Sequence, residues 1–424
     1  MKVVEYPRKQ DWAALLKRPV IDHSVLEERV LAILKEVKER GDKALVDFAQ
    51  KFDGVAIESL EISAKEFEEA NRLVSKELKE AIQVAASNIN KFHSAQKEEG
   101  KKIETMPGVE CWRKSVAISK VGLYIPGGSA PLFSTILMLG IPANIAGCKE
   151  IVLCTPPDKA GKINPAILYT ASFLGIKKVI KAGGAQAIAA MAYGTETVPQ
   201  VYKIFGPGNQ YVTAAKQLVT REGIAIDMPA GPSEVAVLAD ESCNPAFVAA
   251  DLLSQAEHGA DSQVLLVTTN KKVVQCVNEE LDKQLKQLPR EQTAAKALEN
   301  SIAIVIKDTT EAIELLNQYA PEHLIIQTDH FDEFISKIQN AGSVFLGHYT
   351  PEAAGDYASG TNHTLPTNGY ARAYSGVSLD SFVKKITFQK ITKEGLQKLG
   401  PTIETMAEAE QLLAHKNAVN IRIK

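Results

Sequence analysis

The amino-acid sequence predicts an α/β fold with two Rossmann-like domains, each built on a parallel sheet. From Val116 onward, short β-branched or apolar runs alternate with stretches of helical periodicity, which is the pattern of βαβ units. Glycine or proline repeatedly marks the junctions between these runs. The chain has 424 residues, which is too long for one ordinary core and favours two or three domains.

The first part of the chain is predicted to be an arm followed by helices. Residues 1–20 contain two prolines and little periodicity, so we expect a small N-terminal arm lying on the rest of the structure. Ser24 and Ser63 each begin a capping box, S-x-x-E, before a long helical pattern. His93, in the second of these helical segments, is expected to be solvated because the segment is rich in Glu and Lys.

Two sets of strands are predicted downstream. VGLY, IVLC, KVIKA and VYKIF form the first set, with helices beginning near Ser134, Asn164, Ala185 and Asn209. The Gly/Pro-rich stretch DMPAGPSE ends that unit. VAVLAD, QVLLVTT, IAIVI, LIIQ and SVFLG form the second set, and a long ordered loop or lid follows SVFLG because glycines and prolines become dense.

These patterns divide the chain into four parts. We expect an arm at 1–20, a discontinuous main α/β domain at 21–122 with 235–375, a second α/β domain at 123–234, and a helical C-terminal tail domain at 376–424. The tail helix is predicted to run from about Thr402 through Glu410 and His415, and its composition alone is typical of a surface helix.

Composition excludes several classes of partner. The net charge of −3, with acidic and basic residues interspersed, argues against nucleic-acid binding, which needs a basic stripe. No apolar run is long enough to span a bilayer, and the charged first residues contain no secretory signal, so we expect a cytoplasmic protein with no membrane partner. The five scattered cysteines contain no C-x-x-C pair, which predicts reduced thiols rather than disulfides or a thiolate zinc site.

Three glycine-rich junctions follow predicted strands and open helices. They are Tyr124–Gly128, Ala182–Gln186 and Phe205–Asn209. Glycines let backbone amides approach a phosphate, and a helix N-terminus favours its negative charge. None of the junctions contains G-x-G-x-x-G, and a single one of them would be explained by a tight turn alone. Three in one domain favour a phosphate-bearing cofactor.

Polar side chains gather at breaks in the second half of the chain. In SQAEHG, Gln255 and His258 lie three residues apart and share a face if the helix persists, although for this pair alone a frayed helix end with a solvated histidine is the simpler interpretation. The residues of this kind at breaks are Gln255, His258, Glu322, His323, Asp356, His363, Glu410 and His415. Imidazole, carboxylate and amide donors without cysteine suit Zn²⁺, with Mn²⁺ as a substitute.

The positions of SQAEHG and APEH conflict with a simple parallel sheet. Both lie on helix-to-strand connections, whereas ligands in parallel sheets bind beyond the carboxyl ends of the strands. Two arrangements remove the conflict. Either one strand is antiparallel, or the site lies between domains.

Eight segments, in the same order and spread from about residue 120 to 420, resemble histidinol dehydrogenase. They are YIPGGSAPLFST, AGGAQAIAA, GPGNQYV, DMPAGPSEV, SQAEHGADSQ, APEHL, GDYASGTNHTLPT and AEAEQLLAHKNAV. The resemblance implies a homodimer with exchanged C-terminal tails and one zinc per subunit. Its ligands would be Gln255, His258 and Asp356, with His415 from the tail of the other subunit.

The resemblance also implies the positions of substrate and cofactor. NAD⁺ would be held by Tyr124, Gln186 and Asn209. L-Histidinol would be held by the metal ligands and by further polar side chains. The expected substrate-binding set is Ser233, Gln255, His258, His323, Asp356, His363, Glu410 and His415.

The expected reaction is the four-electron oxidation of L-histidinol to L-histidine, with zinc as a template and a retained aldehyde between two hydride transfers. Removing a hydroxyl proton in each step needs a base, and we assign His323 to it. Adding water to the aldehyde needs a second base, and we assign Glu322. Two alternatives are a dehydrogenase of another amino alcohol or polyol, and a zinc hydrolase in which Glu322 activates metal-bound water.

Overall fold

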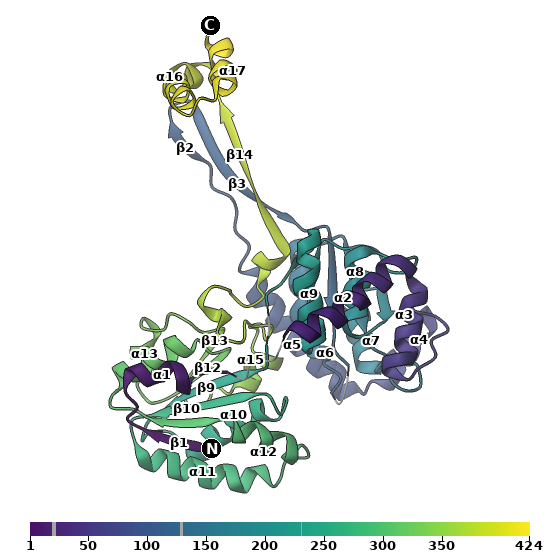
Figure 1. Cartoon of the computed structure of the whole chain (residues 1–424), viewed down its shortest axis with the longest axis vertical. Coiled ribbons are helices and arrows are strands. Elements are labelled where there is room, and N and C mark those ends of the chain that lie inside the picture. The colour runs from purple at the N-terminus through teal and green to yellow at the C-terminus, as the bar shows by residue number, and fades with distance from the viewer. Residues whose placement is uncertain (19–22, 128–129, 230) are drawn as a thin grey trace.

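The computed structural model describes residues 1–18, 23–127, 130–229 and 231–424. Two α/β bodies lie side by side, and an arm of strands and helices projects from them (Figure 1). The described residues form a five-stranded sheet, a six-stranded sheet and a three-stranded sheet. The α/β class with two parallel-sheet domains is therefore confirmed. Within the described part of the chain, no helix is long and apolar enough to cross a membrane.

The five-stranded sheet has the order β6-β5-β4-β7-β8, and every pair in it is parallel. Its strands are β4 (Lys120–Tyr124), β5 (Glu150–Thr155), β6 (Lys178–Lys181), β7 (Lys203–Phe205) and β8 (Ala225–Ile226). The helices between them are α6 (Phe133–Ala146), α7 (Pro165–Phe173), α8 (Gly184–Tyr193) and α9 (Gln210–Val219). The four predicted strands and the four helix starts all agree with this unit.

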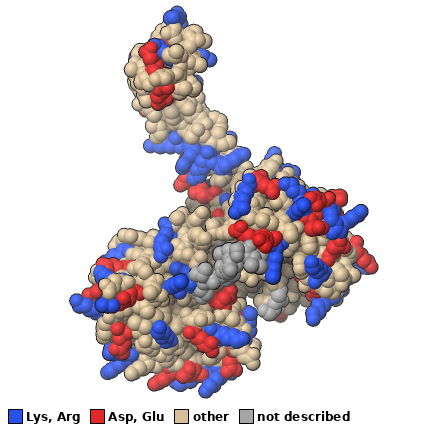
Figure 2. Space-filling model, in the orientation of Figure 1, with Lys and Arg blue, Asp and Glu red and all other residues tan. Residues whose placement is uncertain are grey.

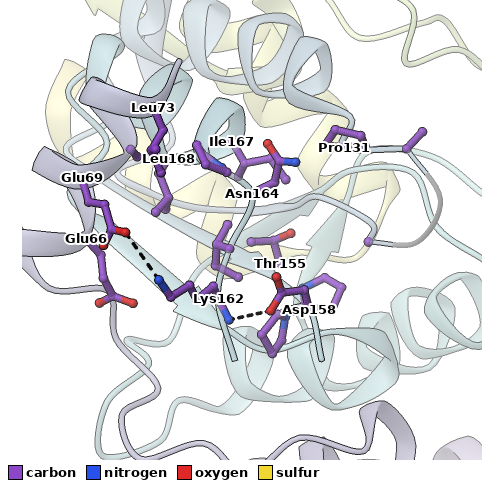
Figure 3. Close-up of a pocket in the computed structure, with 17 residues that line it drawn as sticks. Glu66, Glu69, Leu73, Pro131, Thr155, Asp158, Lys162, Asn164, Ile167 and Leu168 are labelled. Atoms are coloured by element: carbon purple, nitrogen blue, oxygen red, sulfur yellow. Dashed lines mark hydrogen bonds and ion pairs between the residues drawn. The ribbon is translucent and has the colours of Figure 1, made fainter. Parts of the chain in front are cut away.

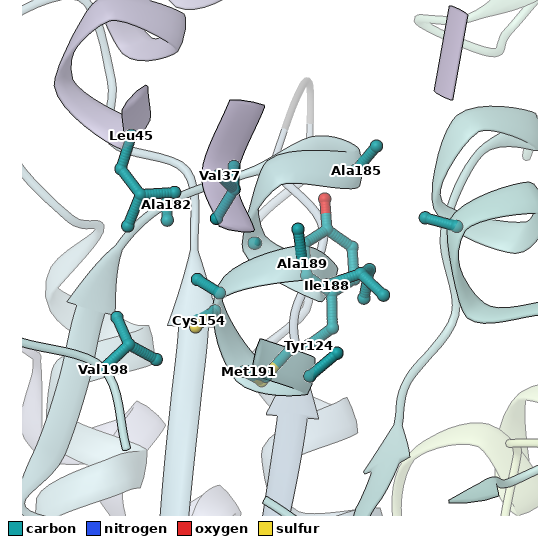
Figure 4. Packing of buried hydrophobic residues seen from close by; sticks show 14 of the residues in the cluster. Val37, Leu45, Tyr124, Cys154, Ala182, Ala185, Ile188, Ala189, Met191 and Val198 are labelled. Atoms are coloured by element: carbon teal, nitrogen blue, oxygen red, sulfur yellow. The ribbon is translucent and has the colours of Figure 1, made fainter. Parts of the chain in front are cut away.

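The N-terminal helices cover this same sheet. They are α2 (His23–Arg40), α3 (Asp42–Phe48), α4 (Ala64–Leu73) and α5 (Lys76–Ser94). Helix α2 packs on α8 and α9, α4 on α7, and α5 on α6. Val37 and Leu45 thus lie in one core with Tyr124 and Ile188 (Figure 4). The prediction that residues 21–122 and 235–375 form one domain is therefore wrong. A parallel sheet needs apolar cover on both faces, and these helices supply part of that cover for the five-stranded sheet.

Two local predictions in these helices were wrong and one was confirmed. Ser63 caps α4 in a reciprocal capping box with Glu66. Ser24 lies inside α2 instead of capping it, and residues 19–22 lie outside the described part of the chain. His93 is fully buried, because it continues the apolar stripe that includes Ala86 and Ile89 on α5.

The six-stranded sheet is also wholly parallel, in the order β1-β11-β10-β9-β12-β13. Its strands are β1 (Lys2–Glu5), β9 (Glu234–Ala239), β10 (Gln263–Thr268), β11 (Ile302–Val305), β12 (His323–Gln327) and β13 (Ser343–Leu346). Its helices are α1 (Trp12–Leu15), α10 (Pro245–Ala256), α11 (Lys271–Leu285), α12 (Glu291–Glu299), α13 (Thr309–Tyr319), α14 (Asp332–Ile335) and α15 (Glu352–Tyr357). The expected N-terminal arm thus begins as an edge strand paired with β11.

The C-terminal residues form the projecting arm together with an earlier part of the chain. The arm consists of β2 (Ile103–Met106), β3 (Val109–Ala117), β14 (Val383–Ile391), α16 (Lys393–Ala409) and α17 (Leu413–Ile423). Strand β14 pairs antiparallel with β3 along its whole length, so residues 376–424 are not a separate tail domain. The predicted tail helix begins earlier, at Lys393, and is two helices.

The projecting arm exposes large apolar side chains. Ile386, Phe388, Met406, Leu413 and Ile421 are all at least one-third exposed. In Figure 2, Lys and Arg gather at the base of the arm, and uncharged side chains cover much of its surface beyond that point. Such a surface is typical of one that another protein covers.

Candidate active site

A buried polar cluster lies at the amino edge of the six-stranded sheet. Glu322 immediately precedes β12, and His323 is its first residue. The His323 Nε2 atom lies 3.6 Å from Asp356 Oδ1, and its Nδ1 atom lies 3.8 Å from Glu322 Oε2. Both Glu322 and His323 are buried. The two residues expected to act as bases are therefore adjacent, with Asp356 beside them.

The backbone around Glu322 explains how it is held. Helix α13 ends at Ala320, in the left-handed region, and Pro321 prevents its continuation. The Glu322 Oε2 atom then accepts a hydrogen bond of 3.0 Å from the backbone N–H of Glu234. Gly342 lies so close that a Cβ there would be 2.5 Å from the Glu322 carbonyl oxygen. The segment APEH is thus fixed from both sides.

Glu352 belongs to this cluster and was not identified from the sequence. It is buried, and its Oε1 atom lies 3.9 Å from His323 Nδ1. His323, Glu352 and Asp356 each offer one ligand atom, and these atoms lie within 4.8 Å of one another. Glu352 and Asp356 are four residues apart on α15, which places them on one face. Interpreting this segment as a loop concealed that spacing.

Gln255 supports a cation site next to the cluster. Its side chain is fully buried, and neither amide atom has a hydrogen-bond partner within the described part of the chain. A buried amide without partners is costly, and a bound cation would satisfy its oxygen. The Asp356 Oδ1 atom has no hydrogen-bond partner there either. His258 is exposed and lies three residues after Gln255. The possible metal ligands are therefore the oxygen atoms of Gln255 and Asp356 and the ring nitrogen of His258, and such a set fits zinc.

The charges in the cluster depend on one another. Burial raises the pKa of the Glu322 carboxyl to about 8, despite the opposing charge of His323. Burial lowers the pKa of His323, but the carboxylates of Glu352, Glu322 and Asp356 outweigh it and raise that pKa to about 10. Burial raises the pKa of Asp356, but the ring of His323, whose Nε2 atom lies 3.6 Å from Asp356 Oδ1, and the nearby imidazoles outweigh it and lower that pKa. A cation bound by Asp356 would offset part of the negative charge that keeps His323 protonated.

His363 connects the cluster to the other domain. Its Nδ1 atom lies 2.8 Å from the backbone oxygen of Asp356, and its Nε2 atom lies 3.0 Å from Thr135 Oγ1 on α6. Burial lowers the pKa of the His363 ring, which favours the neutral form. The position of SQAEHG and APEH is thereby explained. The described strands of both large sheets are parallel, and the cluster lies between the domains.

The remaining predicted residues lie in three places. Ser233 immediately precedes β9, and its carbonyl oxygen accepts a hydrogen bond from the Gln263 backbone N–H. Glu410 and His415 are exposed on the projecting arm, and the structure does not bring them to the cluster of their own chain (Figure 1). The expected NAD⁺ residues Tyr124, Gln186 and Asn209 occupy the carboxyl edge of the five-stranded sheet.

Two of those edge residues already make local hydrogen bonds. The Tyr124 hydroxyl accepts one of 3.0 Å from the Gly184 backbone N–H, and Asn209 Oδ1 caps α9. Gln186 is buried at the start of α8. Gly128, in the first glycine-rich junction, lies outside the described residues.

Comparison with known proteins identifies the family. A family model described as histidinol dehydrogenase matches residues 16–423. A histidinol dehydrogenase of Bacteroides thetaiotaomicron is 62% identical over 423 residues, covering 100% of this chain and 99% of the relative. One from Escherichia coli is 54% identical, covering 96% and 94%. A crystal structure of histidinol dehydrogenase from Elizabethkingia anophelis matches with a TM-score of 0.98 and 58% identity, covering 100% of this chain and 98% of that chain. The chain therefore belongs to the histidinol dehydrogenase family.

Proposed function

We propose that the protein oxidises L-histidinol to L-histidine, the last step of histidine biosynthesis, with two molecules of NAD⁺ used in succession. The observation that carries the proposal is the buried group formed by His323, Glu322 and Asp356 between two α/β domains, in a chain of this family. Two neighbouring bases of different type suit a reaction with two different proton transfers.

The donor set supports a zinc ion in this site. Gln255, His258 and Asp356 would hold it, and the partner subunit's His415 would complete four ligands. When bound, zinc supplies a template and a Lewis acid that orient the amino alcohol. The observation in favour of this assignment is the buried amide of Gln255, which has no hydrogen-bond partner among the residues that the structure describes.

The side chains of this chain would act as follows. In the first oxidation His323 takes the hydroxyl proton, and the carbinol carbon gives its hydrogen with the electron pair to NAD⁺, which yields an aldehyde and NADH. Glu322 then removes a proton from the water that adds to the aldehyde carbon. In the second oxidation His323 takes a hydroxyl proton of the hydrate, and a second hydride transfer yields the carboxylic acid. Burial of both bases limits the entry of other water molecules.

The projecting arm supports a homodimer with shared sites. Glu410 follows α16 and His415 lies on α17, and these two helices are at the outer end of the arm, away from β12 and α15 of the same chain (Figure 1). Its exposed apolar side chains fit a second copy of the chain. Two inactive variants, one altered at His258 and one at His415, should regain activity when mixed and reassembled, because one site of the mixed dimer has all its ligands. No recovery from mixed dimers would contradict shared sites.

Counting NADH per L-histidinol consumed tests the function. The expected ratio is two, with loss of activity after treatment with a chelator and recovery with Zn²⁺ or Mn²⁺. A ratio of one would contradict the second oxidation. No NADH, with hydrolysis of esters or amides instead, would favour the zinc hydrolase. A higher rate with another amino alcohol or polyol than with L-histidinol would show that the other compound is the substrate.

Metal analysis of purified variants tests the cation site separately from activity. His258→Ala should contain at least about tenfold less zinc than the unaltered protein, because loss of one of four ligands weakens binding strongly. His330→Ala is the control, since His330 is an exposed histidine outside the cluster. Equal zinc in the two variants would exclude His258 as a ligand.

A further inference from the structure

The ion pair of Arg18 and Glu234 is buried and lies beside the active-site cluster. The side chains of these two residues are 14% and 2% exposed. A surface pair such as Lys162 with Glu69 in Figure 3, by contrast, has side chains that are 66% and 46% exposed. The Arg18 Nε atom donates a hydrogen bond of 2.8 Å to Glu234 Oε2, and its Nη2 atom donates to the same oxygen. A buried charged pair is stable only if its geometry is good and its remaining hydrogen bonds are made.

Arg18 also contacts the end of helix α13. Its Nη2 atom donates a hydrogen bond of 2.8 Å to the backbone oxygen of Tyr319, and its Cζ atom lies 4.1 Å from the centroid of the Tyr319 ring. The Tyr319 hydroxyl donates in turn to Gln263 Oε1 at 2.9 Å. Tyr319 is the last residue of α13, three residues before Glu322. Arg18 therefore holds two segments at once, the start of β9 and the turn that leads to Glu322.

Glu234 is the first residue of β9, and its backbone contacts both proposed bases. Its N–H donates a hydrogen bond of 3.0 Å to Glu322 Oε2. Its carbonyl oxygen lies 3.4 Å from His323 Nδ1, and because a carbonyl oxygen only accepts, the ring nitrogen donates in that contact. The second side-chain oxygen, Oε1, accepts the backbone N–H of Asn368. The backbone of Glu234 therefore cannot shift relative to the two bases without breaking these bonds.

Stability alone does not explain a charged pair at this place. A buried ion pair adds little stability compared with apolar side chains of the same size, because both charges lose their hydration. A catalytic base, however, must be held closely at its working position, and the groups that hold it must themselves be fixed. Glu322 has no lysine or arginine partner of its own among the described residues. The bonds from Arg18 to Glu234 and to the end of α13 supply what Glu322 lacks.

We propose that Arg18 is a positioning residue for Glu322: through Glu234 and the end of α13, it fixes the carboxylate that removes a proton from water in the second oxidation. The inference rests on the proposed function and adds to it a residue outside the reacting groups. In the described part of the chain Arg18 forms no hydrogen bond with Glu322 or His323, so it acts only through the residues that it bonds. The contact of Glu234 with His323 is the longer one, and alcohol oxidation should therefore depend less on Arg18.

Single-turnover formation of NADH from L-histidinol and from L-histidinaldehyde tests this role. Arg18→Ala should slow aldehyde oxidation by about 10²-fold, as a displacement of about 1 Å at a reacting group does, and should slow alcohol oxidation by a smaller factor. Arg8→Ala is the matched control, because it removes an exposed arginine–aspartate pair from the same N-terminal segment and should leave both rates unchanged. Loss of folded protein lowers both rates equally. An unchanged ratio of the two rates in Arg18→Ala would therefore overturn the role.

Glu234→Gln tests the pair without leaving a buried carboxylate unpaired. It keeps the shape of the side chain, removes its charge, and should lower aldehyde oxidation relative to alcohol oxidation. Arg18→Ala should add little to this effect in the double variant, because both substitutions break the same link. If the effects of the two substitutions on the ratio of rates multiply, the residues act independently and the pair does not carry the effect.

Hydrogen exchange measures the contact with Glu322 without any activity. The Glu234 N–H should exchange faster in Arg18→Ala than in the unaltered protein, whereas the backbone N–H groups of β5 in the other domain should be unaffected. Unchanged exchange at Glu234 would overturn the proposal, and so would faster exchange with an unchanged ratio of rates. If the unaltered protein forms no NADH from L-histidinol, the proposed function fails, and the exchange still shows whether Arg18 fixes this contact.

Discussion

Glu322→Gln should separate the two oxidations. The glutamine oxygen can still accept the Glu234 N–H that now reaches Glu322 Oε2 at 3.0 Å, so the segment before β12 should keep its position. Because burial raises the pKa of Glu322 to about 8, its carboxyl is mostly protonated at neutral pH. A neutral amide of the same shape should therefore cost little stability. The variant loses a base and keeps the fold.

The expected magnitude follows from the role of the base. A positioned general base contributes about 10²- to 10⁴-fold to a rate, which corresponds to roughly 3–5 kcal/mol in the activation barrier. The loss should fall on oxidation of the aldehyde, since that step needs a hydrated carbonyl. Alcohol oxidation should keep most of its rate because His323 is unchanged. Only the deprotonated carboxylate is a base, so aldehyde oxidation by the unaltered protein should increase as pH rises toward 8.

Single-turnover formation of NADH from L-histidinol and, separately, from L-histidinaldehyde measures the two steps. The Glu322→Gln variant should release aldehyde, give one NADH per alcohol, and lose the increase in aldehyde oxidation toward pH 8. Thermal unfolding serves as the control for folding. Equal retention of both rates in a folded variant would refute the role of Glu322 as the base for water.

Three further predictions concern other buried groups. His323→Asn should slow both hydride steps by about 10²-fold or more, and a near-normal rate at neutral pH would exclude His323 as the base. Lys216→Met leaves the buried Asp227 without the cation that pairs with it. The substitution should lower the free energy of unfolding, measured in urea, by about 3–5 kcal/mol. A loss below about 1 kcal/mol would show that the pair is not isolated from water. Burial lowers the pKa of His93, so only the unfolded state binds its proton just below pH 6.5. The unaltered protein should therefore lose stability relative to His93→Leu as pH falls from 7 to 5.5, by up to about 1.4 kcal/mol per pH unit, and a constant difference would contradict a neutral, buried His93.

Most strands of the two parallel sheets were predictable from sequence because they are short apolar runs in chain order, whereas β1, β8 and the three-stranded sheet were not predicted. Which helices cover which sheet was not predictable from sequence. The apolar stripe of a helix such as α2 shows that one face is buried but not which sheet buries it, so residues 23–94 were joined to the wrong domain. The pairing of β14 with β3 was missed for a similar reason, since 266 or more positions separate partners such as Ala117 and Val383.

The site was predictable as a set of residues and only partly as a geometry. Glu322 and His323 were found because they follow a proline at a helix end, where a polar pair is conspicuous. Glu352 was missed because glycine and proline dominate its surroundings and conceal a short helix. His93 was misjudged because its neighbours in sequence are polar while its neighbours in space are apolar. Three-dimensional packing, which no local pattern reports, decided each of these cases.

The pairing of β1 with β11 has a consequence for synthesis of the chain. Lys2 pairs with Ile302, so β1 gains its neighbour only after the ribosome has added about 300 further residues. Residues 23–226 contain a complete sheet with its covering helices and can fold during that interval. The nascent protein therefore carries KVVE as an unpaired strand beside an already folded domain. Closure of the second sheet, and with it the arrangement of both bases, is a late event in the life of each molecule.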